Sequence, residues 1–470
     1  MPRSWATLGV DLHLEPTGPG LRRGLTDALR EAVRTGRLAP GTRLPSSRAL
    51  AADLGIARNT VAEAYADLVA EGWLTARQGS GTSVGERPVS PPAAGPAVGG
   101  GRQASQPVYD LVPGTPDLSA FPRTAWLKAA RRALAVAPHD ALGYGDPRGR
   151  VELRTALAGY LARARGVRTH PDGIVICSGI AHGLRILGQV LRDRGLTSLA
   201  VESYGLDVHW RLLERAGLRT LPLGLDELGT RTEELRADES AGVRAVLLTA
   251  AHQFPIGGAL HPERRAAVVD WARRGDGLIL EDDYDGEFRY DRRPVGALQG
   301  LDPDRVIYLG TASKSLAPGL RLGWLVVPPS IAAEVVTAKG GVDWSCGVLD
   351  QLTLAEFITS GAYDRHVRAA RLHYRRRRDA LVAELARRAP SVRPTGIAAG
   401  LHVVLRLPPG TEQAALRAAA WQGLAVHGLH RYRHPKATVE RRDALVVGYG
   451  TPPDHAWSGA LDALCAALPE

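Results

Sequence analysis

The sequence predicts a multidomain chain: a small α+β head over residues 1–84 and a large α/β body over residues 109–470. Three observations lead to this prediction. Residues 85–108 contain ten glycines and prolines and show no apolar periodicity, which is typical of a linker. Before this linker, short amphipathic segments are separated by turn residues. After it, apolar strand-like runs alternate with amphipathic stretches, which is typical of a largely parallel sheet flanked by helices.

Composition narrows the class of protein before any motif is considered. The formal charge of +10 permits nucleic-acid or other anionic partners. No apolar run approaches the length of a membrane span, and no basic and apolar leader opens the chain. Cys177, Cys346 and Cys465 lie far apart and form no CxxC pair, so we expect neither a disulfide framework nor a metal site. These observations predict a reduced, cytoplasmic protein without a membrane partner.

The head reads as three helices followed by a hairpin. The first helix is predicted by apolar residues at every fourth position: Leu21, Leu25, Leu29 and Val33. Ser46 can cap a second helix, SRALAADL, which should stop at Gly55. A third helix, from about Arg58 to Glu71, follows after a short turn, and WLTARQGSGTSV then suggests two short strands around Gly79-Ser80-Gly81.

Two helices joined by a tight turn and followed by a hairpin are typical of a winged helix-turn-helix that binds double-stranded DNA. In such a module the last helix enters the major groove and its first residues contact base edges. Arginine can pair with guanine and asparagine with adenine. The predicted DNA-contacting residues are Arg43, Ser46, Arg48, Arg58, Asn59, Thr60 and Arg77. Charge alone leaves a small dimerisation domain open, because residues 1–84 hold ten arginines against eight acidic residues.

The order of residues is more specific than their charge. GRLAPGTRLPSSRALAADLGIARNTVAEAYADLVAEGWLTARQGSGT closely resembles the winged helix-turn-helix of GntR-type regulators over about 65 residues. One departure is Ala57, where these regulators usually carry a serine that caps the recognition helix. The resemblance implies binding to an operator in double-stranded DNA.

The body keeps a lysine in YLGTASKSLAPGLRLGW, although only four of the chain's 59 basic residues are lysines. A lysine that holds pyridoxal phosphate (PLP) needs an acidic partner for the ring nitrogen and donors for the phosphate. Each requirement has candidates at strand-to-helix junctions: Lys314, Asp282, Tyr284, Thr311, Ser313, Arg321, Ser178 and Gly179. Taken singly, these are more often a surface lysine, a solvated acidic loop or a helix cap. Their joint order is much harder to obtain by chance.

The body resembles a fold-type I PLP-dependent transferase of the aspartate aminotransferase kind, from about residue 110 to 465. LGYGDPRG at 142–149 and HQFPIGG at 252–258 support this resemblance. With the head attached, the whole chain resembles the MocR/GabR class of bacterial regulators, which are usually dimers. The resemblance implies that Lys314 forms the Schiff base, Asp282 pairs with the ring nitrogen and Tyr284 contacts the 3-oxygen. Thr311, Ser313 and Arg321 would bind the phosphate, and Tyr144 would reach the partner subunit's site.

Several positions depart from the family pattern. Ile180 and Ala181 stand where polar phosphate ligands are usual, and Ile256 stands where Thr or Ser is common. Leu206 occupies the usual position of a tyrosine, which Tyr204 could replace. Val446 occupies the place of the arginine that binds the substrate carboxylate. Three residues could replace that arginine: His430, Arg431 and Arg433.

The sequence therefore favours a DNA-binding transcriptional regulator whose body binds PLP and senses PLP, a small amine or an amino acid. The absent carboxylate arginine favours PLP itself as the signal. The alternative is an active aminotransferase with an accessory DNA-binding module, although the altered substrate-side positions predict at most weak half-transamination. A body that only dimerises is disfavoured because Lys314 and Asp282 are both present.

Overall fold

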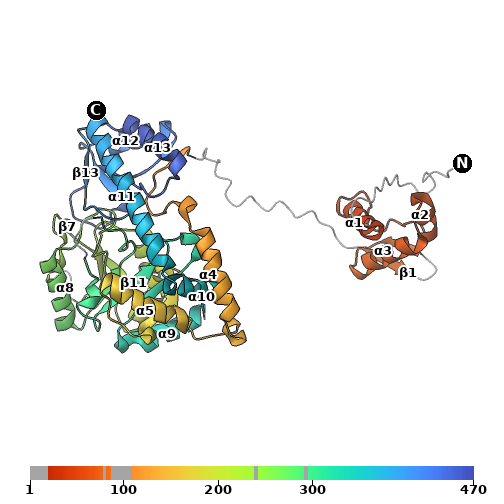
Figure 1. Cartoon of the computed structure of the whole chain (residues 1–470), viewed down its shortest axis with the longest axis horizontal. Coiled ribbons are helices and arrows are strands. Elements are labelled where there is room, and N and C mark those ends of the chain that lie inside the picture. Colours follow the sequence, from red (N-terminus) through yellow and green to blue (C-terminus); the bar gives the residue numbers. More distant parts are fainter. Residues whose placement is uncertain are drawn as a thin grey trace. The chain divides into compact units, whose positions relative to one another are not determined.

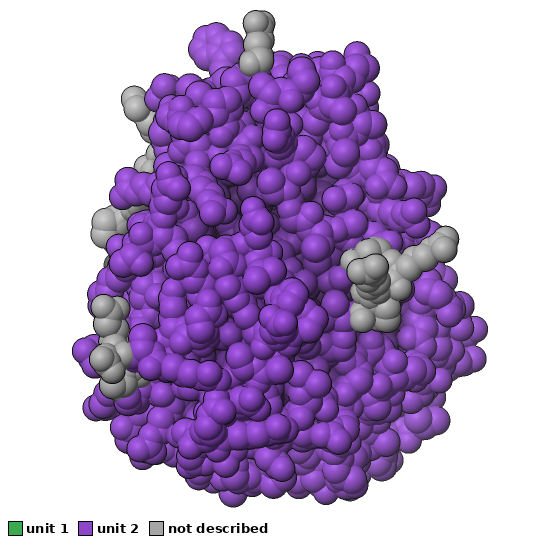
Figure 2. Space-filling model, turned by 90° about the vertical axis from the view of Figure 1, so that its left-hand side faces the viewer, with its two compact units in different colours: residues 1–104 green, residues 105–470 purple. Residues whose placement is uncertain are grey.

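The computed structural model describes residues 20–77, 81–85, 107–237, 242–290, 295–343 and 345–469. Within it the chain divides into two compact units, residues 1–104 and 105–470 (Figure 1). Figure 2 shows the surface of the second unit. Most of the expected linker and the hairpin residues Gly79 and Ser80 lie outside the described residues.

The head contains the three helices and the hairpin that the sequence predicts. Its elements are α1 (Leu21–Arg34), α2 (Ser47–Leu54), α3 (Arg58–Ala70), β1 (Leu74–Arg77) and β2 (Gly81–Val84). The strands β1 and β2 pair antiparallel. Apolar side chains from all three helices and both strands form one core, including Leu25, Leu29, Leu50, Leu68 and Val84. The winged helix-turn-helix fold of the head is confirmed.

A seven-stranded sheet forms the centre of the body, in the order β4-β12-β11-β10-β9-β5-β6. Its strands are β4 (Ile174–Cys177), β5 (Ser198–Glu202), β6 (Arg219–Leu223), β9 (Ala245–Leu248), β10 (Leu278–Asp282), β11 (Val306–Thr311) and β12 (Gly323–Val326). All neighbours pair parallel except β12, which is antiparallel to both β11 and β4. The expected largely parallel sheet is thus present, with one reversed strand.

Helices cover both faces of this sheet. Successive residues of a strand point to opposite faces, so alternate residues of β4 pack against different helices. Ile174 and Ile176 of β4 pack in a cluster with α5 (Val151–Arg165) and α10 (Val348–Thr359). Val175 and Cys177 pack in a cluster with α6 (Ile180–Asp193), α7 (Asp207–Arg215) and α9 (Pro329–Val342). Strands buried on both sides explain why these runs read as continuously apolar in the sequence.

The remaining helices complete the body around this sheet. They are α4 (Arg123–Val136), α8 (Pro262–Gly275) and α11 (Ala362–Arg388), the long helix that runs toward the C-terminal part in Figure 1. That part has a four-stranded sheet, in the order β13 (Arg393–Thr395), β14 (Val403–Arg406), β17 (Ala444–Val447) and β16 (His427–Gly428). Its helices are α12 (Glu412–Trp421) and α13 (Asp454–Ala467), and β15 (Leu424–Ala425) pairs with β3 (Tyr109–Asp110).

Candidate functional site

The parallel strands of the body end along one edge of the sheet, and a pocket lies at this edge. Asp282 is the last residue of β10, Thr311 the last of β11 and Glu202 the last of β5. All three line the pocket. Open α/β sheets generally bind ligands at the carboxyl ends of their strands. Seven predicted cofactor residues line this pocket: Gly179, Asp282, Tyr284, Thr311, Ser313, Lys314 and Arg321.

Two predicted cofactor residues lie elsewhere. Ser178 is not among the residues that line the pocket. Its backbone N–H donates to Nδ1 of His182 at 3.0 Å, and its hydroxyl lies 3.4 Å from Sγ of Cys346. Tyr144 is 98% exposed, so within one chain it does not contribute to the pocket.

Lys314 follows the end of β11 and directs its amine into the pocket, where the carbonyl of Gly114 accepts its hydrogen bond. Burial lowers the pKa of Lys314 below its ordinary value, and the carboxylates of Asp285 and Asp282 oppose that shift. A lowered pKa increases the fraction of neutral amine, which is the form that reacts with a carbonyl carbon.

Asp282 provides a buried carboxylate on the same side of the sheet. The residue is 4% exposed, and among the described residues no group hydrogen-bonds to its buried Oδ1. Burial, reinforced by the charge of Asp283, raises the pKa of Asp282 to about 8. A protonated ring nitrogen in the pocket would give this oxygen its missing partner.

Polar groups from three segments also line the pocket. The Thr311 hydroxyl donates to the Ser313 hydroxyl at 2.8 Å. Arg321 adopts φ 52°, in the left-handed region that non-glycine residues seldom occupy outside constrained sites. Its guanidinium lies beside Gly179, the N-cap of α6, so that a Cβ on Gly179 would be 3.5 Å from Nη1. A helix N-terminus, an arginine and two hydroxyls are a donor set that suits a phosphate.

Sequence reasoning missed His209, which lies on α7 and lines the pocket. Its Nδ1 is 3.7 Å from Oδ2 of Asp282, and burial lowers the pKa of His209 to about 4. The imidazole of His209 is therefore neutral at pH 7 and does not form an ion pair with Asp282. A single histidine in an amphipathic helix has no spacing signal, so the sequence offered no way to select it.

Much of the remaining pocket lining is apolar or aromatic, with Tyr204, Leu206 and Phe254 among the lining residues. Arg321 is the only arginine that lines it in the described part of the chain. Val446 is fully buried in an apolar cluster with Tyr204 and Phe254.

None of the three suggested replacements for the carboxylate arginine lines the pocket. The Arg433 guanidinium donates to the carbonyls of Ala437 and Val439. His430 forms ion pairs with Glu412 and Asp443 when it is protonated. Apart from Arg321, the described pocket therefore has no arginine to bind a substrate carboxylate.

In the head, Arg58 and Asn59 are exposed in the first turn of α3. Ser46 caps α2, since its hydroxyl accepts from the backbone N–H of Ala49 at 3.2 Å. Ala57 is the N-cap of α3 and makes no side-chain capping bond.

The other predicted DNA contacts also lie at the surface of the head. Arg48 of α2 and Arg77, the last residue of β1, are exposed, and Thr60 is partly exposed. The Arg43 side chain lies against Gly81 of the wing. The predicted DNA contacts therefore lie on α3 itself, on α2 and the segment before it, and on the strand after α3.

Comparison with known proteins supports both halves. Residues 21–84 match the family described as bacterial regulatory proteins, gntR family, and residues 110–440 match aminotransferase class I and II. The pyridoxine biosynthesis transcriptional regulator PdxR of Corynebacterium glutamicum is 34% identical, with 93% of each chain covered. The probable rhizopine catabolism regulatory protein MocR of Rhizobium meliloti is 35% identical, with 87% of each chain covered.

This chain belongs to the MocR type of bacterial transcriptional regulators. Its MocR-type body is also similar to a solved kynurenine aminotransferase from Pyrococcus horikoshii, in complex with PMP, at 25% identity. The TM-score is 0.69, with 77% of this chain and 91% of that one covered. Thermus thermophilus aspartate aminotransferase with maleate shares the fold, with a TM-score of 0.67 at 22% identity. The fold-type I transferase fold predicted for this MocR-type body is confirmed.

Proposed function

We propose that this regulator binds PLP in the body pocket and changes its affinity for operator DNA in response. The observation that carries the proposal is the convergence of Lys314, Asp282, Tyr284 and Arg321 in one pocket of a chain that also carries a winged helix-turn-helix. A regulator of this kind acts on chromosomal DNA in the bacterial cytoplasm.

Each pocket residue has a role that follows from its chemistry. PLP, when bound, supplies an electrophilic aldehyde carbon and a ring that accepts electrons. The Lys314 amine would hold the cofactor covalently, and Asp282 would pair with the ring nitrogen. Tyr284 would donate to the phenolic oxygen. The phosphate would be bound by Thr311, Ser313 and Arg321, with backbone N–H groups at the start of α6.

PLP itself is our proposed signal. A free α-carboxylate would need a cationic partner, and Arg321, the one arginine that lines the described pocket, is assigned to the phosphate. The lining is otherwise rich in apolar and aromatic side chains, which suits the cofactor ring better than an amino acid. The same reasoning argues against an efficient aminotransferase, which would have to orient a carboxylate for every turnover.

The active molecule is proposed to be a homodimer. Several large apolar side chains are exposed on α4 and the segment after it: Leu127, Leu134, Val136, Leu142 and Tyr144. An exposed group of this kind is typical of a protein interface. Two copies would also present two heads, and binding at two half-sites raises affinity for DNA without new contacts.

The decisive experiment is to titrate PLP into the full chain bound to labelled DNA from upstream of its gene. Visible absorbance reports cofactor bound to lysine, and fluorescence anisotropy reports DNA binding. We expect both signals to change at the same PLP concentration. Lys314→Ala should abolish the absorbance change, whereas Lys436→Ala, at an exposed lysine, should leave it intact. A Lys314→Ala protein that still gave the visible band would contradict the site.

DNA recognition by α3 has its own test. Arg58→Ala and Asn59→Ala should each weaken specific binding by about 1–3 kcal/mol, as expected for a lost base contact. Arg34→Ala, at an α1 residue paired with Glu31, is the control and should change affinity little. Steady transamination of amino acids with no specific DNA binding would instead favour the enzyme alternative.

A further inference from the structure

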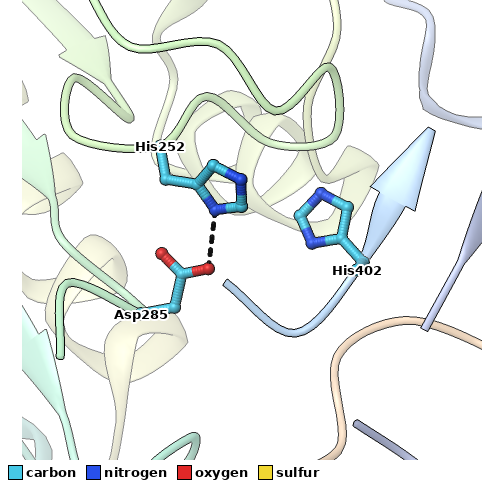
Figure 3. Close-up of side chains that lie close together, drawn as sticks. All are labelled: His252, Asp285 and His402. Carbon is cyan, nitrogen blue, oxygen red and sulfur yellow. Dashed lines mark hydrogen bonds and ion pairs between the residues drawn. The ribbon is translucent and has the colours of Figure 1, made fainter. Parts of the chain in front are cut away.

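Three buried side chains beside the pocket have no role in the function proposed above: His252, Asp285 and His402 (Figure 3). They are 3%, 3% and 5% exposed. Asp285 directly follows Tyr284 in the chain, and His402 itself lines the pocket. The three come from segments that are distant in sequence, so only the fold brings them together.

The position of one hydrogen can be deduced from the contacts of His252. Its Nδ1 lies 2.7 Å from Oδ2 of Asp285 and 3.1 Å from the hydroxyl of Tyr284. A ring nitrogen carries either one hydrogen or one lone pair. Two lone pairs facing each other, one on Nδ1 and one on a carboxylate oxygen, would repel at this distance, so we assign the hydrogen to Nδ1, which donates it to Asp285.

This assignment constrains Tyr284. Because Nδ1 already carries a hydrogen, the Tyr284 hydroxyl cannot donate to it and can only accept a weak second branch of that bond. The phenolic hydrogen of Tyr284 must therefore point elsewhere. Asp285, which already accepts from His252, is one further hydrogen-bond partner of Tyr284, and the pocket that Tyr284 lines is the other direction.

We propose that His252 and Asp285 are positioning residues that keep the Tyr284 hydroxyl turned as a hydrogen-bond donor toward the pocket. The inference rests on the proposed function only for the identity of the acceptor, the phenolic oxygen of the cofactor. Without this pair, the Tyr284 hydroxyl could donate either into the pocket or toward the position of His252, and its hydrogen bond to the cofactor would weaken.

The surroundings hold the pair rigidly. Gly400 has φ +72°, and a Cβ at this position would overlap both the His252 ring and the Asp285 carboxylate. The His402 ring packs on His252 with a centroid distance of 5.0 Å, and Nε2 of His402 lies 3.0 Å from the carbonyl of Pro255. A hydrogen bond excluded from water and clamped on two sides has a strong orienting effect.

Two imidazoles and a carboxylate are also ligands that transition metals accept. The contacts favour the hydrogen-bonded arrangement, because Nδ1 of His252 is already bonded to Asp285 and Nε2 of His402 faces a carbonyl. Binding a metal through these atoms would break both interactions.

The first test is the visible absorption maximum of the full chain loaded with PLP. Tyr284→Phe defines the shift caused by losing the donor. We expect His252→Gln and Asp285→Asn to move the maximum in the same direction by a smaller amount, and to add nothing in the Tyr284→Phe background. His427→Gln is the matched control, because Nδ1 of His427 lies 2.7 Å from the Tyr432 hydroxyl, outside the pocket. It should cause no shift.

An undisturbed maximum in both variants, or an equal shift in the Tyr284→Phe background, would overturn the proposal. Absence of a visible band in the unsubstituted protein would instead contradict the proposed function. The positioning role can then still be tested without cofactor, by nitrogen NMR of protein labelled at histidine. The His252 signal is assigned as the one that is lost in His252→Gln. In the unsubstituted protein this signal should show a protonated Nδ1. An unprotonated Nδ1, or one equivalent of bound metal that is lost in His402→Ala, would overturn the inference.

Discussion

Asp282 and Lys314 bring opposite charges into one pocket, and burial disfavours the charged form of each residue. The pKa of Asp282 rises to about 8 and that of Lys314 falls. Keeping Asp282 ionised in this buried pocket therefore costs free energy of folding when no cationic group is bound beside it. A cofactor with a protonated ring nitrogen would remove part of that cost, which links cofactor binding to the stability of the fold.

This cost predicts a pH dependence for the cofactor-free protein. Because the folded-state pKa of Asp282 lies above the unfolded value of about 3.9, the folded state binds more protons between pH 4 and pH 8. Its contribution is therefore most favourable near pH 4 and is lost as the pH rises through 8, by about 1.4 kcal/mol per pKa unit. Asp282→Asn removes this titration, so its melting temperature relative to the unsubstituted protein should increase between pH 5 and pH 8.5.

Thermal melts of both proteins at the two pH values measure this difference. Titrating groups distant from Asp282 are common to the two proteins and cancel. Asp270→Asn, at an exposed position of α8, is the control and should show no such trend. A difference between Asp282→Asn and the unsubstituted protein that stays constant with pH would contradict the assignment.

Substitution of two glycines by alanine can distinguish the cost of backbone strain from the cost of a steric overlap. Gly400 and Gly410 have φ +72° and +80°, and a Cβ would meet nothing within 4 Å at Gly410. Gly410→Ala should therefore lower the free energy of unfolding by about 1–2 kcal/mol, the cost of a left-handed alanine. Gly400→Ala should cost clearly more, because the added methyl would overlap His252 and Asp285. Urea unfolding of both variants provides the comparison, and equal losses would show that the pair can move aside.

At the scale of elements, the head shows how caps define its helices. Ser46 closes the start of α2 by a side-chain bond, and Gly55 ends that helix at φ 65°. The start of α3 lacks the equivalent bond because Ala57 has no polar atom to offer. The helix that we expect to contact bases therefore begins without a side-chain cap, and the Thr60 N–H donates to the Ala57 carbonyl instead.

Ala57→Ser should add this missing cap. Ala57 already has extended backbone angles, φ −67° and ψ 138°, as an N-cap serine requires. We expect the cap to stabilise the first turn of α3 by about 1 kcal/mol. Its amides should then exchange more slowly with solvent, which hydrogen exchange on the full chain measures. Ser46→Ala, which deletes a cap that is present, should speed exchange at the start of α2. Unchanged exchange in α3 would mean that its start is already stabilised by other contacts.

At the scale of the whole molecule, the two units have separate cores, and the body carries an exposed apolar group on and after α4. No helix in the described ranges is long and apolar enough to cross a membrane. In the proposed dimer, coupling between cofactor and DNA would pass through the arrangement of subunits and heads. A ligand shifts such an arrangement only by its differential affinity for the two states.

The dimer prediction follows from that apolar group. Leu134→Glu combined with Val136→Asp places charges on side chains that are 55% and 82% exposed in one chain. We expect the mass measured by light scattering to fall to that of a single chain and the affinity for operator DNA to drop. Trp421→Glu, at a residue 90% exposed on α12, is the control and should leave the mass unchanged. A double variant of unaltered mass would place the interface elsewhere.

Much of the site could be predicted because its residues follow strands. The runs GLILEDDY and RVIYLG are buried on both faces, so their apolar residues are recognisable, and Asp282 and Thr311 stand where the strands end. Ser178 is grouped with the site because it follows a strand, but it does not line the described pocket. The resemblance assigns Tyr144 to the partner subunit's site, and that assignment stays a prediction. His209 and His402 were not selected, because an isolated histidine carries no pattern of spacing.

The sequence by itself determined the two folds and the strand-end residues of the body, because apolar periodicity, caps and turn residues are local and each is written in a short segment. Only the tertiary structure decided what lies beside those residues. The reversed strand β12 places Gly323 next to Cys177, and loops around residues 252, 285 and 402 meet at one point. Such contacts depend on how distant segments pack, and packing is a property of the whole chain rather than of any segment.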